Sequence, residues 1–153
     1  MAKLVLGETN MNLERLYFLR EKCDLTQEQM GKIVGVKKFS ISNWEKTKEI
    51  IPLEKLNIYS NYFNISLDYI LNLSDNPKSN LNTNHILDKS DIGNRLKQLR
   101  IKNNLSQREM AKILNTTQSA VWSYETGKTL ILTAFAYQIC KHFNVSMDWI
   151  CGK

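Results

Sequence analysis

Apolar residues recur every three or four positions along most of the chain, which is the spacing of helices with one buried face. Residues that start or end helices interrupt this pattern. Thr26 with Gln29 three positions later is typical of a capping box, and Gly35 tolerates the left-handed backbone that often follows a helix. In the first half of the chain these signals predict helices from about Leu13, from Thr26 to Val34, over Lys37–Lys46, from about Pro52, and from Ser66 to about Leu71.

The same pattern returns 80 positions later without a gap. Leu13–Ile70 and Gly93–Ile150 share 18 identities in 58 aligned pairs. Asn115 stands where the first copy has Gly35, and asparagine is the next residue to adopt the left-handed conformation readily. A copy of this length can bury a core of its own, so the repeat predicts two small domains rather than a solenoid. Caps of the first, second and last helices of the second copy are expected at Asp91, Ser106 and Ser146.

The segment between the copies has little hydrophobic periodicity. It contains Asn, Ser and Asp together with Pro77, a composition typical of a flexible linker. We therefore expect a first helical domain over residues 10–72, a linker over 73–90 and a second helical domain over 91–153. A flexible coil of about 19 residues spans roughly 25 Å, so the two domains would be able to reach one partner together.

Composition and charge narrow the classes of partner. The formal net charge is +6, and residues 76–153 carry all of it, because residues 1–75 hold ten basic and ten acidic side chains. A basic surplus favours a polyanionic partner. No apolar run approaches the roughly 18 residues that span a bilayer, so we expect a cytoplasmic protein with no membrane partner. The three cysteines lack metal-binding spacing, and we expect no metal and no cofactor.

Two helices joined by a tight turn form a helix-turn-helix, and residues 26–45 and 106–125 have its spacing. The family resemblance is carried by the segments LREKCDLTQEQMGKIVGVKKFSISNWEK and LRIKNNLSQREMAKILNTTQSAVWSYETGK. They resemble the Cro/C1-type repressor domains of phages and bacteria, also called the XRE family. The endings FNISLDYIL and FNVSMDWICGK are similar to the usual end of such domains. The resemblance implies an all-α fold of two lambda-repressor-like five-helix domains joined by a flexible linker.

The resemblance also implies which residues meet double-stranded DNA. In this family the Gln that begins the second helix contacts phosphate or base, and the start and outer face of the third helix read base edges. Lysines after the third helix would contact phosphates. The implied residues are Gln27, Lys37, Lys38, Phe39, Asn43, Lys46 and Lys48 in the first copy, and Gln107, Thr117, Gln118, Ser119, Ser123 and Lys128 in the second. Because these sets differ, we expect the copies to read different sequences.

The family also pairs an Arg in the first helix with a Glu that ends the third. Arg20 with Glu45, and Arg100 with Glu125, fit that pair. The alternative for each is two surface charges that contribute little to stability. Recurrence at the same spacing in both copies favours the ion pair.

The first copy departs from the family pattern after its third helix. Thr47 occupies the position of a glycine in the second copy, and a β-branched residue disfavours positive φ, so we expect this loop to take another path. Phe39 would either meet a thymine methyl or pack inward, and the pattern favours neither. By periodicity Trp44 and Trp149 are expected on core faces, whereas Trp122 is a candidate for exposure.

These observations predict a sequence-specific transcriptional regulator that binds double-stranded DNA, a repressor of phage or mobile-element type. An enzyme is not expected, because the chain lacks a phosphate loop, a metal cluster or the Ser-Lys pair of self-cleaving repressors. The regulator would act as a monomer with two reading heads or as a homodimer with four. The alternative is that one half binds DNA while the other, most simply the neutral first half, is a protein-interaction or dimerisation module, antitoxin-like or bound to another regulator.

Overall fold

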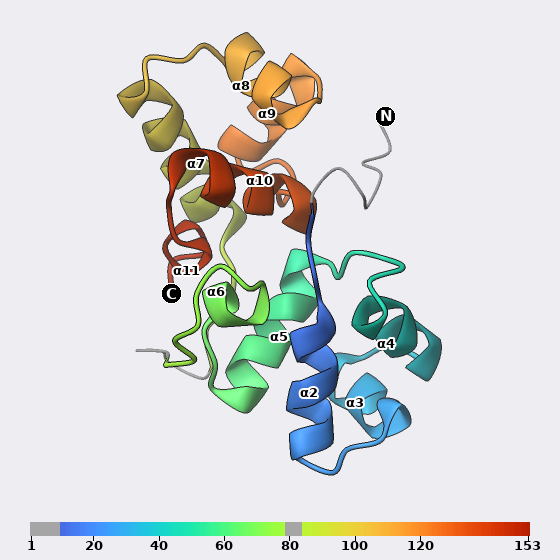
Figure 1. The fold of residues 1–153 in the computed structure, drawn as a ribbon. Helices are drawn as coiled ribbons and strands as arrows, with labels where there is room; N and C mark the ends of the chain where they lie inside the picture. Colours follow the sequence, from blue (N-terminus) through green and yellow to red (C-terminus); the bar gives the residue numbers. More distant parts are fainter. Residues whose placement is uncertain (1–9, 79–83) are drawn as a thin grey trace.

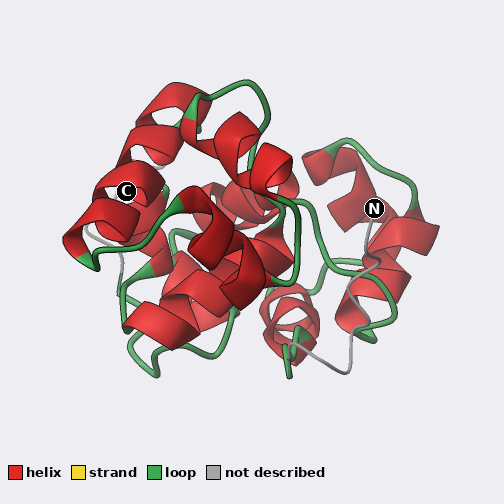
Figure 2. Cartoon of the chain, turned by 90° about the horizontal axis from the view of Figure 1, so that it is seen from above, coloured by secondary structure: helices red, strands yellow, loops and turns green. Residues whose placement is uncertain are grey.

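The computed structural model describes residues 10–78 and 84–153, and all regular secondary structure within them is helical (Figures 1 and 2). The helices occur in the same order in the two halves of the chain. The N-terminal half contains α2 (Glu14–Lys22), α3 (Gln27–Val34), α4 (Lys38–Glu45), α5 (Leu53–Phe63) and α6 (Leu67–Ile70). The C-terminal half contains α7 (Lys89–Lys102), α8 (Gln107–Leu114), α9 (Gln118–Glu125), α10 (Thr133–Phe143) and α11 (Met147–Ile150).

Local sequence signals explain where α3 begins and ends. Thr26 Oγ1 accepts a hydrogen bond from Gln29 N at 3.1 Å, and the Gln29 side chain accepts one from Thr26 N at 2.8 Å. The predicted capping box is therefore confirmed. Gly35 follows the helix with φ of 75°, and Asn115 follows the equivalent helix α8 with φ of 53°. Both turns are left-handed, as the two residues predict.

Helix α7 begins earlier than its predicted cap. Asp88, not Asp91, is the cap, and its carboxylate accepts hydrogen bonds from Ser90 N at 2.8 Å and Asp91 N at 3.0 Å. The prediction of a cap at Asp91 is wrong, because an equally good capping residue precedes it by three positions. Asp91 lies in the first turn of α7, where a carboxylate still interacts favourably with the helix dipole.

The loop after α4 follows the same path as its counterpart after α9. Thr47 has φ of 53°, close to the 72° of Gly127, so the prediction of a different path is wrong. A hydrogen bond that the sequence did not reveal offsets the cost of this conformation. Leu13 N, at the start of α2, donates to Thr47 Oγ1 at 3.2 Å.

Each half buries apolar residues between its own helices, and the buried apolar residues of the two halves belong to one continuous core. In the N-terminal half the core includes Leu16, Met30, Ile41, Trp44 and Leu56. In the C-terminal half the corresponding layer includes Leu96, Met110, Val121 and Ala136. Gly31 permits the close approach of α3 to the segment that leads into α4, since a Cβ there would lie 2.5 Å from the carbonyl oxygen of Val36.

The three tryptophans have different environments. Trp44 is buried and Trp122 is exposed, as expected from the sequence. Trp149 is 40% exposed, so its assignment to a core face is wrong. Helix α11 has only four residues, and Met147 and Ile150 occupy its buried positions. Periodicity over so short a helix does not define a buried face.

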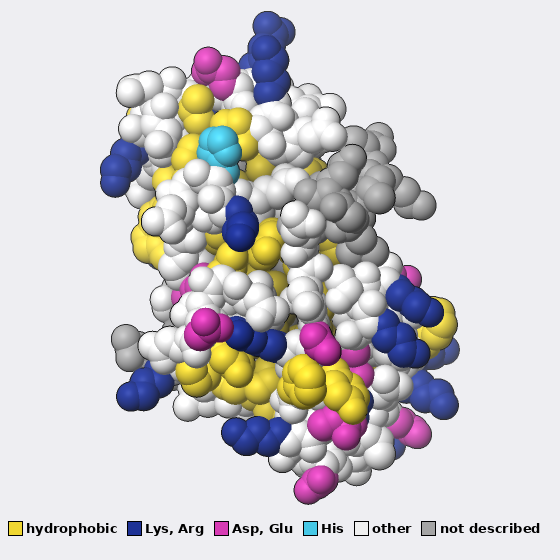
Figure 3. Space-filling view, viewed as in Figure 1, with side chains coloured by type: hydrophobic (Ala, Val, Ile, Leu, Met, Phe, Trp, Pro, Cys, Tyr) yellow, Lys and Arg dark blue, Asp and Glu magenta, His cyan; other side chains and the backbone are white. Residues whose placement is uncertain are grey.

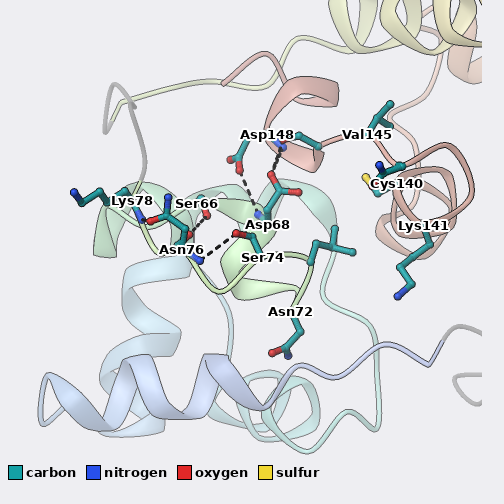
Figure 4. Close-up of a pocket in the computed structure, with 13 residues that line it drawn as sticks. Ser66, Asp68, Asn72, Ser74, Asn76, Lys78, Cys140, Lys141, Val145 and Asp148 are labelled. Atoms are coloured by element: carbon teal, nitrogen blue, oxygen red, sulfur yellow. Dashed lines mark hydrogen bonds between the residues drawn. The ribbon is translucent and has the colours of Figure 1, made fainter.

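The two halves pack against each other through α6 and α11 (Figure 1). Asp148 accepts hydrogen bonds from the backbone N–H groups of Leu67 at 3.0 Å and Asp68 at 3.3 Å. Asp68 accepts hydrogen bonds from the backbone N–H groups of Met147 at 2.8 Å and Asp148 at 3.2 Å, and from Ser146 Oγ at 2.6 Å. Each aspartate therefore caps the short helix of the other half (Figure 4). We call this arrangement the reciprocal cap.

Other contacts between the halves surround the reciprocal cap. Thr133 Oγ1, at the start of α10, donates to the carbonyl oxygen of Ile51 at 2.6 Å, and both residues are buried. The Lys153 ammonium, next to α11, reaches α5. It donates to three side chains at 2.7–2.9 Å, those of Asn57, Ser60 and Asn61. These contacts join the halves independently of the connecting chain.

Parts of the predicted linker are bound to the helices. The carbonyl oxygen of Ser74 accepts a hydrogen bond from Arg15 at 2.8 Å. The carbonyl oxygen of His85 accepts hydrogen bonds from the side chains of Asn57 and Asn61 at 2.9 and 2.8 Å. The flexibility expected of residues 73–90 therefore does not extend to these positions. Residues 79–83, in the middle of the segment, lie outside the described residues.

Candidate nucleic-acid interface

In each half a buried salt bridge ties the first helix to the end of the third. Arg20 Nε lies 2.5 Å from Glu45 Oε1, and Arg20 Nη2 lies 3.0 Å from Glu45 Oε2. Arg100 and Glu125 form the same bidentate pair with the same two distances. Both predicted ion pairs are present, and the side chains of Glu45 and Glu125 are each only 3% exposed. Hydrogen bonding to the carboxylate raises the pKa of each arginine, so the guanidinium stays charged.

The arginines also hold the chain between the first two helices. Arg20 Nη1 donates to the carbonyl oxygen of Leu25 at 2.6 Å, and Arg100 Nη1 donates to that of Leu105 at 2.8 Å. One guanidinium thus fixes the start of the helix-turn-helix and the end of its second helix at once. The repeated ion pair is therefore a structural part of the motif and not two solvent-exposed surface charges.

Gln27 and Gln107 extend these ion pairs. Gln27 Nε2 donates to Glu45 Oε2 at 3.0 Å, and Gln107 Nε2 donates to Glu125 Oε2 at 3.0 Å. Both side chains are half-buried. The family resemblance implied that these glutamines contact DNA, and the sequence did not reveal their hydrogen bonds to glutamate. A contact with DNA would use the amide groups that this hydrogen bond leaves available.

We call α4 and α9 the reading helices, because they carry the predicted base-reading residues. The reading surface of α4 is basic and aromatic. Lys37 is the N-cap residue of α4, and Lys38 and Phe39 follow it, all exposed. Phe39 is 71% exposed, so it points outward rather than into the core. Asn43, one turn further along, is half-buried.

The reading surface of α9 is polar and uncharged over its first turn. Thr117 caps the helix by accepting a hydrogen bond from Ala120 N at 3.1 Å. Gln118 and Ser119 are exposed, and Ser123 is half-buried. A surface hollow over α9 is lined by Gln107, Gln118, Ser119, Trp122, Ser123 and Lys128. The structure thus brings five of the six residues predicted for the second copy to one place, and adds Trp122 to them.

Three lysines follow the reading helices. Lys46, Lys48 and Lys128 are exposed, as phosphate contacts require. Lys128 Nζ lies 5.8 Å from the centre of the Trp122 ring, within reach of a cation–π interaction. Lys and Arg side chains gather over the α4 edge of the N-terminal half (Figure 3).

The two reading helices lie toward the same side of the molecule. In Figure 1, α4 is on the right of its half and α9 is on the right of the other half, whereas α6 and α11 meet on the left. The first residues of both helices, Lys38 and Phe39 in α4 and Gln118 and Ser119 in α9, are exposed, so the contacts between the halves leave them uncovered.

Comparisons with known proteins agree with this geometry. A family model described as "Helix-turn-helix domain" matches residues 13–76, and one described as "Helix-turn-helix" matches residues 96–150. The uncharacterized HTH-type transcriptional regulator YobD of Bacillus subtilis is 36% identical over 85 residues, which is 54% of this chain and 76% of YobD. Antitoxin PezA of Streptococcus pneumoniae is 36% identical over 62 residues, which is 40% of this chain and 39% of PezA. No solved structure matches the chain significantly.

Both halves contain a five-helix unit that exposes its third helix. This arrangement defines a helix-turn-helix protein of the XRE type. The chain belongs to the helix-turn-helix family of transcriptional regulators. These findings support a DNA-binding regulator. In the described parts of the chain, no helix combines the length and the apolar character that crossing a membrane requires.

Proposed function

We propose that this chain is a sequence-specific repressor of phage or mobile-element type that places α4 and α9 in successive major grooves of one DNA duplex. The observation that carries the proposal is the repeated Arg–Glu–Gln arrangement behind two uncovered reading helices on one side of the molecule. In helix-turn-helix dimers the half-sites lie about 34 Å apart, one turn of the duplex. Here one chain supplies both heads.

The exposed side chains match the chemistry of base edges. Lys38 has the charge and length to reach guanine O6 and N7, and Gln118 can form a bidentate pair with adenine N6 and N7. Thr117 uses its hydroxyl as a helix cap, which leaves its methyl group for a thymine methyl. Lys46, Lys48 and Lys128 would contact phosphates, which add affinity without reading sequence.

The different reading surfaces favour an asymmetric operator. The two heads would select different half-sites, because one presents Lys37, Lys38 and Phe39 and the other presents Thr117, Gln118 and Ser119. A monomer would therefore bind a site that is not a palindrome. A homodimer would instead protect twice the length with four heads, and sedimentation of the complex at working concentration separates these arrangements.

Selection of bound duplexes from random DNA tests the proposal. The expected result is enrichment of one asymmetric site whose footprint covers two successive major grooves on one side. Gln118→Ala should weaken binding about tenfold and relax the sequence preference in one half-site only. Failure to enrich any duplex over scrambled oligonucleotides would contradict the proposed function.

A second candidate function is that one half binds a protein partner, as an antitoxin does, while the other binds DNA. Two observations favour it: residues 1–75 carry no net charge, and 40% of the chain aligns with antitoxin PezA. Replacing both Lys37 and Lys38 with alanine separates the two functions. Unchanged operator affinity and unchanged salt dependence would favour the protein-interaction function, whereas loss of base or phosphate contacts would lower both.

A further inference from the structure

We infer that Trp122 is a specificity-determining residue of the second head, and that its indole packs against the C5-methyl group of a thymine in the major groove. This inference rests on the proposed function. The family resemblance did not assign Trp122 any role. Three observations on the described residues carry the inference.

The first observation is the position of Trp122 on α9. It follows Ser119 by three residues and Gln118 by four, and residues three and four apart share one face of a helix. With 3.6 residues per turn, its direction around the helix axis falls between those of Gln118 and Ser119. Trp122 is therefore central to the reading face. Side chains in helices lean toward the N-terminus, which brings the indole back toward the base-reading turn.

The second observation is the exposure of the Trp122 side chain. Trp122 is 48% exposed, although tryptophan is among the largest apolar side chains. It lines the hollow over α9 together with polar side chains, and its neighbour Lys128 lies 5.8 Å from the ring centre. The indole ring is thus flanked by the Gln118 amide, by serine hydroxyl groups and by Lys128. This arrangement fits the floor of a major groove, where the C5-methyl group of thymine is the apolar group that a protein can contact.

The third observation is the contrast with the first head. There an aromatic residue also stands on the reading face, but three positions earlier: Phe39 corresponds to Ser119, and Ser42 corresponds to Trp122. Phe39 is exposed and Ser42 is half-buried. Each reading helix thus presents a single exposed aromatic side chain, displaced by about one turn between the heads. We conclude that the two half-sites differ in where a thymine methyl is recognised.

Replacing single thymines by deoxyuridine tests the inference, because deoxyuridine lacks only the C5-methyl group. The probe is the highest-affinity duplex selected from random DNA, with each thymine of the α9 half-site replaced in turn. One replacement should weaken binding of the wild-type chain about fourfold, as expected for one buried methyl group. The same replacement should leave the affinity of Trp122→Ser unchanged, and Trp122→Phe should retain most of the effect.

Matched variants keep the test specific. Leu132→Ser removes another exposed apolar side chain, at the start of α10, and should keep the wild-type response to deoxyuridine. The double variant Ser119→Phe with Trp122→Ser gives the second head the aromatic pattern of the first, and should move the sensitive thymine. Circular dichroism checks that Trp122→Ser folds.

Two results would overturn the inference. One is equal sensitivity of wild type and Trp122→Ser at every thymine of a well-bound duplex. The other is sensitivity that stays at the same thymine in the double variant. Failure to select any duplex at all is a different result, because it would contradict DNA binding itself.

Discussion

Asp68 and Asp148 each cap the helix that carries the other, so one pair of carboxylates joins the two halves of the chain. Two carboxylates in contact do not both ionise easily. Burial, and then the hydrogen bond with Asp68, raise the pKa of Asp148 to about 7. Burial also raises the pKa of Asp68, but hydrogen bonds from Asp148, Ser146 and backbone amides outweigh it and hold that pKa below its ordinary value. The two aspartates of the reciprocal cap therefore differ in pKa, although the geometry of the cap is nearly symmetric.

This inequality predicts different effects of the two Asp→Asn variants. Asp68→Asn should lower the free energy of unfolding by about 1–2 kcal/mol at pH 5, because the ionised acceptor of the hydrogen bonds from Ser146 and from the backbone N–H groups of Met147 and Asp148 is lost. Asp148→Asn should lower it by less than about 0.5 kcal/mol at that pH, because asparagine resembles the protonated acid. Urea unfolding of both variants measures the difference. Equal losses would contradict the assignment of the proton to Asp148.

The same pair predicts a pH dependence. The folded-state pKa of Asp148, about 7, lies above its ordinary value of about 4. Its contribution to stability is therefore complete below about pH 4 and is lost as the pH rises toward 7. Asp148→Asn removes this titration, so its free energy of unfolding should rise relative to wild type between pH 5 and pH 7.5. Measuring the difference between the two chains cancels groups that titrate in both.

The contacts between the halves predict a fixed spacing between the reading helices. Inserting five base pairs between the half-sites rotates one of them by about half a turn. Binding should then fall about 100-fold or more toward the affinity of a single head, because a second contact adds roughly 10²–10⁴ in affinity when the geometry allows it. Gel-shift titration of matched duplexes measures this loss.

A variant of the contact between the halves provides the control for that prediction. Combining Asp68→Asn with Thr133→Ala removes hydrogen bonds on both sides of the interface and should make binding more tolerant of the insertion. If the wild-type chain tolerated the insertion equally well, a freely moving tether would describe the molecule better.

The buried ion pairs predict strong and non-additive effects on stability. Arg100→Leu leaves Glu125 buried without its cation and also removes the hydrogen bond to Leu105. The loss in free energy of unfolding should be about 3–5 kcal/mol. Adding Glu125→Met should recover a large part of this loss, because no charge then remains buried. Urea unfolding of the three chains forms the cycle, and Arg20→Leu should repeat the first result in the other half.

Substitutions at the equivalent positions of the two loops after the reading helices should change the stability in opposite directions. Thr47→Asn should raise the free energy of unfolding by about 0.5–1 kcal/mol, since asparagine adopts positive φ more readily and keeps a side-chain oxygen. Gly127→Thr should lower it by about 2 kcal/mol or more, because φ is 72° and a Cβ would lie 2.8 Å from Ser90 Cα. Thermal unfolding of both variants measures the shifts. A destabilised Thr47→Asn would mean that the threonine fits its site better than the φ angle indicates.

The sequence by itself determined the features of the fold that depend on interactions between residues close together in the chain. Several features depend on neighbours within a few residues or on a regular spacing. They are the helix starts at Thr26 and Ser106, the left-handed turns at Gly35 and Asn115, and the burial of Trp44. The repeat added further information, because a feature seen at the same place in both copies indicates a shared constraint. The ion pairs of Arg20 and Arg100 were found in this way, with the help of a family resemblance.

Only the tertiary structure decided the features that depend on distant groups. Thr47 adopts positive φ although its side chain disfavours it, and its Oγ1 accepts a hydrogen bond from Leu13 N, 34 positions away. Gln27 and Gln107 bond to glutamates 18 positions away. The reciprocal cap joins residues about 80 positions apart. No local pattern encodes such pairs, because their energies exist only once packing has excluded water and brought the partners together.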